Sequence, residues 1–210
     1  MPRQAVYEAV VLAEWGAQAD GSHDLGHLRR VWKNCCWIAE REGDGDIDVL
    51  QAAAFLHDVI NLPKDSPDRA RASRMSAEFA VEFLRGDGFP VAKLPDVFHA
   101  IEAHSFSADI TPTTLEARIM QDADRIDALG AVGIARMMYI AGALGRQLFD
   151  ADDPWAERRA MDDTRFAIDH FETKIFGLEK TMTTDAGRIL AQKRTAIMRQ
   201  YCANLREELT

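Results

Sequence analysis

The sequence predicts an all-α protein, and three observations support this prediction. Apolar residues recur at helical spacing along nearly the whole chain. The alternation of apolar and polar residues that marks a half-buried strand is almost absent. The helical stretches are separated by glycine-containing breaks, at residues 21–22, 43–45 and 86–88. We therefore expect a helical bundle without a sheet.

Eight helices are expected between these breaks, over residues 4–19, 24–41, 48–58, 68–85, 91–105, 113–143, 165–179 and 184–208. The glycine breaks end the first, second and fourth of them. The third is rich in alanine and stops at a polar turn, because Pro63 and Pro67 cannot continue a helix. The fifth follows Pro90.

The second half of the chain is less regular. Either Thr113 or Thr114 can cap the sixth helix, and Glu116 completes a capping box if Thr113 is the cap. Residues 145–165 are acidic and irregular, which predicts a loop or a flap. The last helix carries apolar residues near one face, so we expect that face to pack on the domain or on a partner.

Composition narrows the class of protein. The chain has 210 residues, 47% of them hydrophobic, which is enough for one sizeable core. The net charge of −9 disfavours DNA and RNA as partners, because no basic run offsets it. The odd number of cysteines and the absence of a Cys-x-x-Cys motif fit a reducing cytoplasm. We see no signal peptide and no stretch apolar enough to span a membrane.

Three of the predicted helices place a polar residue on their apolar face. His27 shares a face with Val31, and His57 shares one with Ala54. Asp122 lies in the middle of the apolar stripe of the sixth helix. A buried polar group costs free energy unless it has a partner, and an aspartate is rarely fully buried without one. We therefore predict that these side chains share a divalent metal ion.

The neighbour of His57 joins this set. Adjacent residues in a helix diverge by about 100°, so His57 and Asp58 reach one ion only near a helix end. The turn that contains Pro63 puts the pair at such an end. The same face argument places His104 inside the site and His99 outside it, which favours one ion over two.

The arrangement resembles that of a known family. The segments that carry the resemblance are Asp24-x-x-His27-x-x-Arg30-Val31, Leu56-His57-Asp58, His104-Ser105-Phe106-Ser107 and Gln121-Asp122-Ala123-Asp124-Arg125. They resemble the HD-domain metal-dependent phosphohydrolases, and among these the YedJ/YpgQ-like subfamily. The tail also matches, in His170-Phe171-Glu172-x-Lys174 and Met182-x-Thr184, so the resemblance covers nearly the whole chain. It implies one HD-type domain over residues 1–210, with a core at about 20–143 and a C-terminal helical extension at about 150–210.

The resemblance also implies a ligand set and an activity. The implied metal ligands are His27, His57, Asp58 and Asp122. The implied reaction converts (deoxy)nucleoside triphosphates to monophosphate and pyrophosphate. A phosphodiesterase, a 5′-nucleotidase or a non-catalytic nucleotide sensor on the same scaffold stay open. The 5′-nucleotidase is disfavoured, because Asn61 stands where some of these enzymes carry a glutamate.

Further expectations concern the ion, the catalytic groups and the partners. Nitrogen and oxygen donors without sulfur favour Mn²⁺, with Fe²⁺, Co²⁺, Ni²⁺, Mg²⁺ and Zn²⁺ open. The catalytic candidates are His104 as a general acid or phosphate donor, Lys64 as a phosphate-binding charge on the rigid turn, and His23 one turn before His27. We expect a nucleotide or another phosphorylated metabolite as ligand, neither nucleic acid nor a membrane as partner, and leave a homodimer open.

Overall fold

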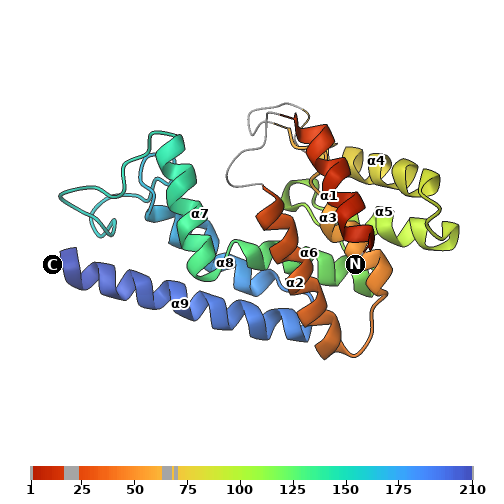
Figure 1. Cartoon of the computed structure of the whole chain (residues 1–210). Helices are drawn as coiled ribbons and strands as arrows, with labels where there is room; N and C mark the ends of the chain where they lie inside the picture. Colours follow the sequence, from red (N-terminus) through yellow and green to blue (C-terminus); the bar gives the residue numbers. More distant parts are fainter. Residues whose placement is uncertain (1, 17–23, 63–67, 69–70, 210) are drawn as a thin grey trace. The chain divides into compact units, whose positions relative to one another are not determined.

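The computed structural model describes residues 2–16, 24–62, 68 and 71–209. These residues form nine α-helices and several short 3-10 and π segments (Figure 1). Within the described part of the chain there is no β-strand, and the one isolated bridge joins Gln147 to Phe166. The prediction of an all-α fold is confirmed.

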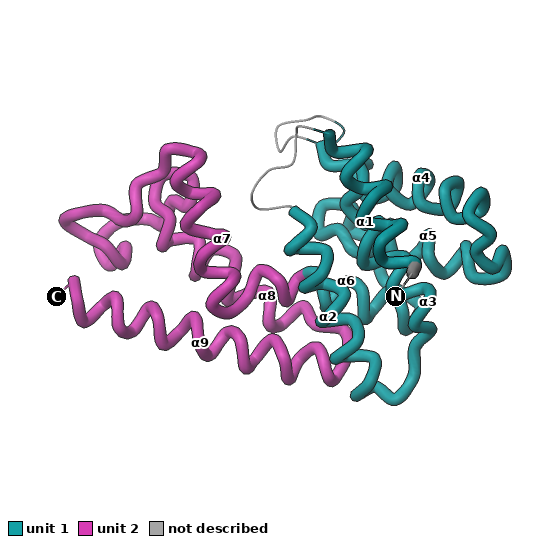
Figure 2. Tube along the Cα trace, viewed as in Figure 1, with its two compact units in different colours: residues 1–124 teal, residues 125–210 magenta. Residues whose placement is uncertain are grey.

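The chain divides into two compact units, residues 1–124 and residues 125–210, which Figure 2 colours separately. The border falls inside helix α6, Leu115–Asp127. The division expected from the sequence, a core at about 20–143 and an extension at about 150–210, stays a prediction.

Helix α3 lies at the centre of the first unit. This unit holds most of α6 and the helices α1 (Pro2–Trp15), α2 (Leu25–Glu42), α3 (Ile47–Leu56), α4 (Ala72–Gly86) and α5 (Leu94–Glu102). Helix α3 packs against α1, α2, α4 and α5. Ala52, Ala53 and Ala54 are fully buried, and their small side chains let the surrounding helices approach closely. The alanine-rich stretch of the sequence is therefore the middle of the core.

The ends of α2 and α3 are set by local chemistry. The Oδ1 atom of Asp24 accepts a hydrogen bond from the backbone N–H of His27 at 2.8 Å, which caps α2. Gly43 ends this helix with a φ of 77°, a left-handed conformation that favours glycine. Helix α3 ends at Leu56, two residues before the predicted end at Asp58. The His-Asp pair thus follows the helix.

The start of α6 differs in detail from the capping box considered for it. Thr114 is the cap, because its Oγ1 accepts a hydrogen bond from the backbone N–H of Ala117 at 3.2 Å. The Oε1 atom of Glu116 accepts a hydrogen bond from the backbone N–H of Asp46 at 2.9 Å. Glu116 therefore ties the start of α6 to the start of α3, and the capping box that depends on Thr113 is not formed.

The prediction of one helix over 113–143 is wrong. The stretch contains two helices, α6 and α7, and α7 spans Gly130–Ala143. Leu129 is extended, with φ −110° and ψ 160°, and Gly130 has a φ of 77°. Glycine adopts that conformation without the steric cost that a side chain brings. Apolar residues continue through the break at helical spacing, so periodicity alone does not reveal it.

In the second unit, α7 packs on α9, Asp185–Leu209. Residues 145–165 are irregular, as predicted. The helix predicted over 165–179 is instead a short π segment, Phe171–Ile175, followed by α8, Phe176–Leu178. The loop that precedes it is held by a buried carboxylate, because Asp169 accepts two hydrogen bonds from Arg159 at 2.5 and 2.9 Å.

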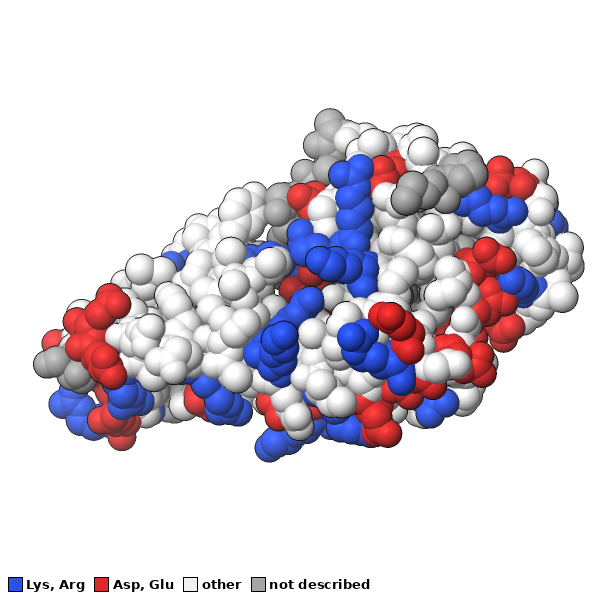
Figure 3. Space-filling model, turned by 60° about the horizontal axis from the view of Figure 1, so that its bottom comes forward, with Lys and Arg blue, Asp and Glu red and all other residues white. Residues whose placement is uncertain are grey.

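No single helix in the described part of the chain is long and apolar enough to cross a membrane. Taken together, α6 and α7 reach that length and apolar character, but the two helices are bent by 64° at the break between them. Basic and acidic side chains both occur on the face drawn in Figure 3. Despite the net charge of −9, this face is therefore not uniformly acidic.

Candidate metal centre

Helix α2 supplies His27 from its first turn. The cap at Asp24 fixes the backbone there, and the side chains of Asp24 and Arg30 both lie close to Gly26. A Cβ atom on Gly26 would lie 3.0 Å from the Oδ1 atom of Asp24 and 3.1 Å from the Nη1 atom of Arg30. A side chain at this position would press on both groups. The first turn is therefore closely packed, and His27 itself is buried.

Helix α6 supplies Asp124, and two side-chain amides tie this helix to the rest of the unit. Asn34 of α2 donates a hydrogen bond to the carbonyl oxygen of Ala123 at 3.0 Å. Gln121 donates one to the carbonyl oxygen of Ala103, just after α5, at 2.8 Å. Both amides are buried, so α6 is fixed at two points within the three residues that precede Asp124.

The proton positions on two rings follow from their backbone contacts. The Nδ1 atom of His57 lies 3.0 Å from the carbonyl oxygen of Ala54, and the Nδ1 atom of His104 lies 2.6 Å from that of Ile101. A carbonyl oxygen only accepts, so each Nδ1 carries a proton. In the neutral rings the lone pair is therefore on Nε2, which faces the carboxylate of Asp58 in both cases.

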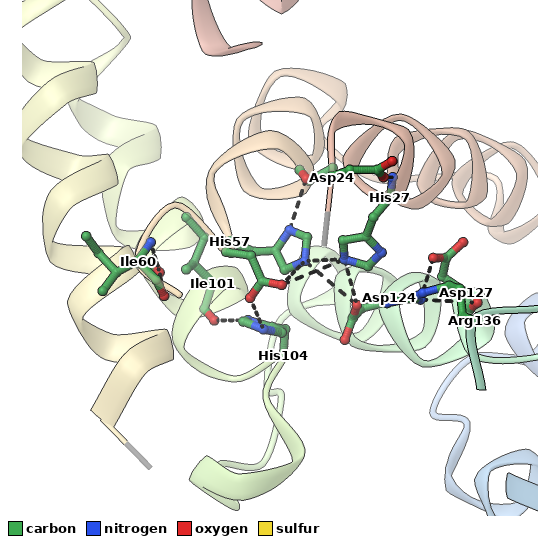
Figure 4. A network of polar contacts seen from close by, with 12 residues as sticks. Asp24, His27, His57, Ile60, Ile101, His104, Asp124, Asp127 and Arg136 are labelled. Atoms are coloured by element: carbon green, nitrogen blue, oxygen red, sulfur yellow. Dashed lines mark hydrogen bonds and ion pairs between the residues drawn. The ribbon is translucent and has the colours of Figure 1, made fainter. Parts of the chain in front are cut away.

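The donor atoms converge on one point, as Figure 4 shows for His27, His57 and Asp124. The Nε2 atoms of His27 and His57 lie 3.2 Å apart. The Oδ1 atom of Asp124 lies 3.5 Å from the first and 3.7 Å from the second. The Oδ2 atom of Asp58 lies 3.8 Å from the Nε2 atom of His27 and 3.6 Å from that of His57.

The other carboxylate oxygen of Asp58 points to a third ring. Its Oδ1 atom lies 3.7 Å from the Nε2 atom of His104. Two overlapping groups result, and the potential ligand atoms of each lie within 4.8 Å of one another: His27, His57 and Asp124, and His57, Asp58 and His104. Asp58 and Asp124 are the more accessible members, with 24% and 27% of their side chains exposed.

This arrangement fits a divalent cation. Burial is the main cause that lowers the pKa of His57 to about 4. The carboxylates of Asp58 and Asp124 act in the opposite direction, and the rings of His104 and His27 lower the pKa further. His57 is therefore neutral near neutral pH, which is the form that binds metals. Acceptor atoms that face one another repel, and a cation among them removes that repulsion.

Sulfur does not join the donor set. Cys35 lies on α2 and is fully buried. Burial raises the pKa of its thiol well above the ordinary value, with smaller contributions from Cys36 and Asp124. The thiolate, which is the form that binds metal, is thus strongly disfavoured.

The structure brings together His27, His57 and Asp58, as the sequence predicted, but it does not bring Asp122 to them. Asp122 is fully buried and belongs to neither group of clustered ligand atoms found in the described residues. Two residues on, Asp124 faces the histidines. Positions two apart on a helix point about 200° away from each other, so only one of the two faces this cluster. We therefore replace Asp122 by Asp124 in the proposed ligand set.

The other residues considered for the site are two further histidines in the described structure, His104 and His99, and two residues outside it. His104 lies beside Asp58, inside the cluster. His99 lies elsewhere, and its Nε2 atom accepts a hydrogen bond from the backbone N–H of Thr113 at 2.9 Å. Lys64 and His23 lie outside the described residues.

The fold and the cluster define a class of protein, and comparison with known proteins identifies the same class. The family model of the HD domain matches residues 24–129, which include all five clustered residues. The chain belongs to the HD-domain family, whose members are metal-dependent phosphohydrolases.

Relatives with the same fold cover almost the whole chain. The protein YpgQ of Bacillus subtilis, described as uncharacterized, is 32% identical over 191 residues, which are 89% of this chain and 84% of YpgQ. The crystal structure of YpgQ in complex with ADP matches with a TM-score of 0.74 and 30% identity, over 98% of this chain and 97% of that one. An HD-superfamily hydrolase of Bacillus thuringiensis matches with a TM-score of 0.75 and 28% identity, over 99% and 96%. The chain is thus a YpgQ-like HD-superfamily hydrolase.

Proposed function

We propose that the protein is a metal-dependent nucleotide pyrophosphohydrolase, which converts a (deoxy)nucleoside triphosphate and water to the monophosphate and pyrophosphate. The observation that carries this proposal is the convergence of His27, His57, Asp58 and Asp124 from three separate segments of the chain. The complex of the relative YpgQ with ADP supports a nucleotide as the ligand.

The four side chains would hold one divalent ion; their nitrogen and oxygen donors suit Mn²⁺, Fe²⁺, Co²⁺ or Ni²⁺, and we propose Mn²⁺. Such an ion supplies a Lewis acid for a phosphoryl oxygen and lowers the pKa of water. The chain contributes fixed ligands. His57 keeps its proton on Nδ1 through the carbonyl oxygen of Ala54, and the partly exposed Asp58 and Asp124 leave the centre open to substrate.

The further roles in this proposal belong to residues around the ligands. His104 has an Nε2 atom next to Asp58 and is our candidate to contact a phosphate or the leaving group. Lys64 and His23 stay candidates from the sequence. We also propose that the protein acts in the cytoplasm, since Cys35, Cys36 and Cys202 are free thiols. Self-association into a homodimer stays open to measurement by size-exclusion chromatography.

The proposal is tested by incubating the Mn²⁺-loaded protein with dATP and separating the products by chromatography. We expect dAMP and pyrophosphate in equal amounts, because water attacks the α-phosphorus and the α–β anhydride bond breaks. Orthophosphate as the only phosphate product would instead show a phosphatase. The same assay with dAMP and with a cyclic dinucleotide reveals a 5′-nucleotidase or a phosphodiesterase.

A variant separates an enzyme from a silent nucleotide sensor. His57→Ala should abolish both the bound metal and the turnover of dATP. If metal content and turnover are unchanged, the proposed centre is not the active site. If the wild-type protein binds Mn²⁺ and nucleotide but turns over none of these substrates, it is a sensor.

A further inference from the structure

The segment that carries the His-Asp pair is anchored from outside its own helix. Helix α3 ends at Leu56, so the backbone of the residues that follow is not held by a regular helical ladder. The indole Nε1–H of Trp15, the last residue of α1, donates a hydrogen bond to the carbonyl oxygen of Asp58 at 3.0 Å. Trp15 is buried. This is a long-range contact, because the two residues are 43 positions apart.

A second anchor lies two residues further along. The Oγ atom of Ser76, on α4, accepts a hydrogen bond from the backbone N–H of Ile60 at 3.1 Å. The same hydroxyl lies 3.4 Å from the carbonyl oxygen of Ile60, to which it donates. Ser76 is fully buried. Two helices thus hold the backbone of residues 57–60 through one side chain each.

The direction of the Asp58 carboxylate depends on this backbone. Its side chain has only two rotatable bonds, so the position of the Cα–Cβ bond decides where the oxygens can lie. One oxygen, Oδ2, faces His27 and His57, and the other, Oδ1, faces His104. A small rotation of the Asp58 peptide would withdraw the carboxylate from both groups.

We propose that Trp15, together with Ser76, positions Asp58 for metal binding. This inference rests on the proposed function, because it assumes that Asp58 is a metal ligand. Trp15 touches neither the metal ligand atoms nor a substrate in this scheme. It acts through the Asp58 backbone, as groups outside the ligand shell do in other metal sites, where their loss costs about 10–100-fold in metal affinity or activity.

The test compares two tryptophan-to-phenylalanine variants by calorimetric titration with Mn²⁺. Trp15→Phe keeps an aromatic ring and removes the N–H that binds Asp58, so the Kd for Mn²⁺ should rise by about 10–100-fold. Trp155→Phe is the matched control. The Nε1 atom of Trp155 is buried, and it has no hydrogen-bond partner in the described structure. Its replacement should leave the Kd at the wild-type value.

Stability is measured on the same samples without metal, by thermal unfolding in EDTA. A Kd for Trp15→Phe within about twofold of the wild-type value, in a folded protein, overturns the proposal. If Trp15→Phe does not fold, Ser76→Ala decides, because it removes the second anchor. A Kd several-fold above the wild-type value supports the proposal, and an unchanged Kd overturns it. If the wild-type protein itself binds no Mn²⁺, the proposed metal centre is wrong and this inference fails with it. If the wild-type protein and all variants bind Mn²⁺ equally, only this inference is wrong.

Discussion

The Nε2 atoms of His27 and His57 lie 3.2 Å apart, although the residues are 30 positions apart in sequence. His57 donates through Nδ1 to Ala54, so its Nε2 is the ring's acceptor when the ring is neutral. The Nε2 atom of His27 either donates a hydrogen bond to this acceptor or presents a second lone pair, and in the second case a cation between the rings and the carboxylates removes the repulsion. The pair is therefore the centre of the proposed site, and the carboxylates of Asp58 and Asp124 bring negative charge to it.

The first prediction contrasts two aspartates on α6. Asp124→Asn should raise the Kd for Mn²⁺ by at least about tenfold, because an amide is a weaker ligand than a carboxylate. Asp122→Asn should leave the Kd near the wild-type value and lower the free energy of unfolding, because its carboxylate is in the interior. Calorimetric titration and urea unfolding of both variants check this. The reverse pattern would restore Asp122 to the ligand set.

This contrast also shows what the sequence could and could not predict. The rule that a buried carboxylate needs a partner selects the more buried of the two, Asp122. The ligand that we propose in its place, Asp124, lies at the edge of the core, and its side chain is 27% exposed. The pattern of apolar residues along one helix does not show which other helix packs against each of its faces. Placing Asp124 needed the packing of α6 against α2, which Asn34 and Ala123 hold in register.

The histidines were easier to place from the sequence. His27, His57 and His104 fall on the apolar faces of the predicted helices, and all three are buried in the structure. The break between α6 and α7 was missed for the opposite reason, because Leu129 continues the apolar pattern while its backbone leaves the helix. The spacing of apolar residues predicts that a segment is helical. It does not reveal a break at which the apolar spacing continues, and only the backbone angles show such a break.

The second prediction concerns the pH dependence of the metal-free protein. Burial lowers the pKa of His57 from 6.5 to about 4. Between these values the unfolded chain binds a proton at this residue and the folded chain does not. The contribution of His57 to the free energy of unfolding is therefore fully present above about pH 6.5 and is lost as the pH falls toward about 4, by roughly 3 kcal/mol in total.

This dependence is measured by urea unfolding in EDTA at about pH 7 and at about pH 4.5. Other groups titrate over the same range, so the measurement needs a reference that lacks this imidazole. His57→Gln is that reference, and it should lose less stability than the wild-type protein on acidification. Equal losses in the two proteins would show that His57 is not held neutral by burial.

The third prediction separates metal binding from turnover. His104 lies 3.7 Å from Asp58, and its ring is 4.8 Å from that of His57 in an edge-on arrangement. If it contacts the substrate, His104→Gln should lower kcat for dATP by about 100-fold and keep the wild-type amount of bound Mn²⁺. Metal analysis of the purified variant, beside its steady-state kinetics, checks both. A loss of metal in proportion to the loss of rate would make His104 a ligand instead.

The last prediction uses two glycines of α7 that differ in their surroundings. A Cβ atom at Gly133 would lie 2.2 Å from the carbonyl oxygen of Ala128, a backbone atom at the break before α7. Gly133→Ala should therefore lower the free energy of unfolding by at least about 2 kcal/mol. A Cβ atom at Gly142 would meet no atom within 4 Å, so Gly142→Ala should raise stability by about 0.5–1 kcal/mol through helix propensity. Thermal or urea unfolding compares the two. Because Ala128 turns its carbonyl toward Gly133 only when the helix is interrupted, equal stability of both variants would mean that α6 and α7 join as one continuous helix in solution.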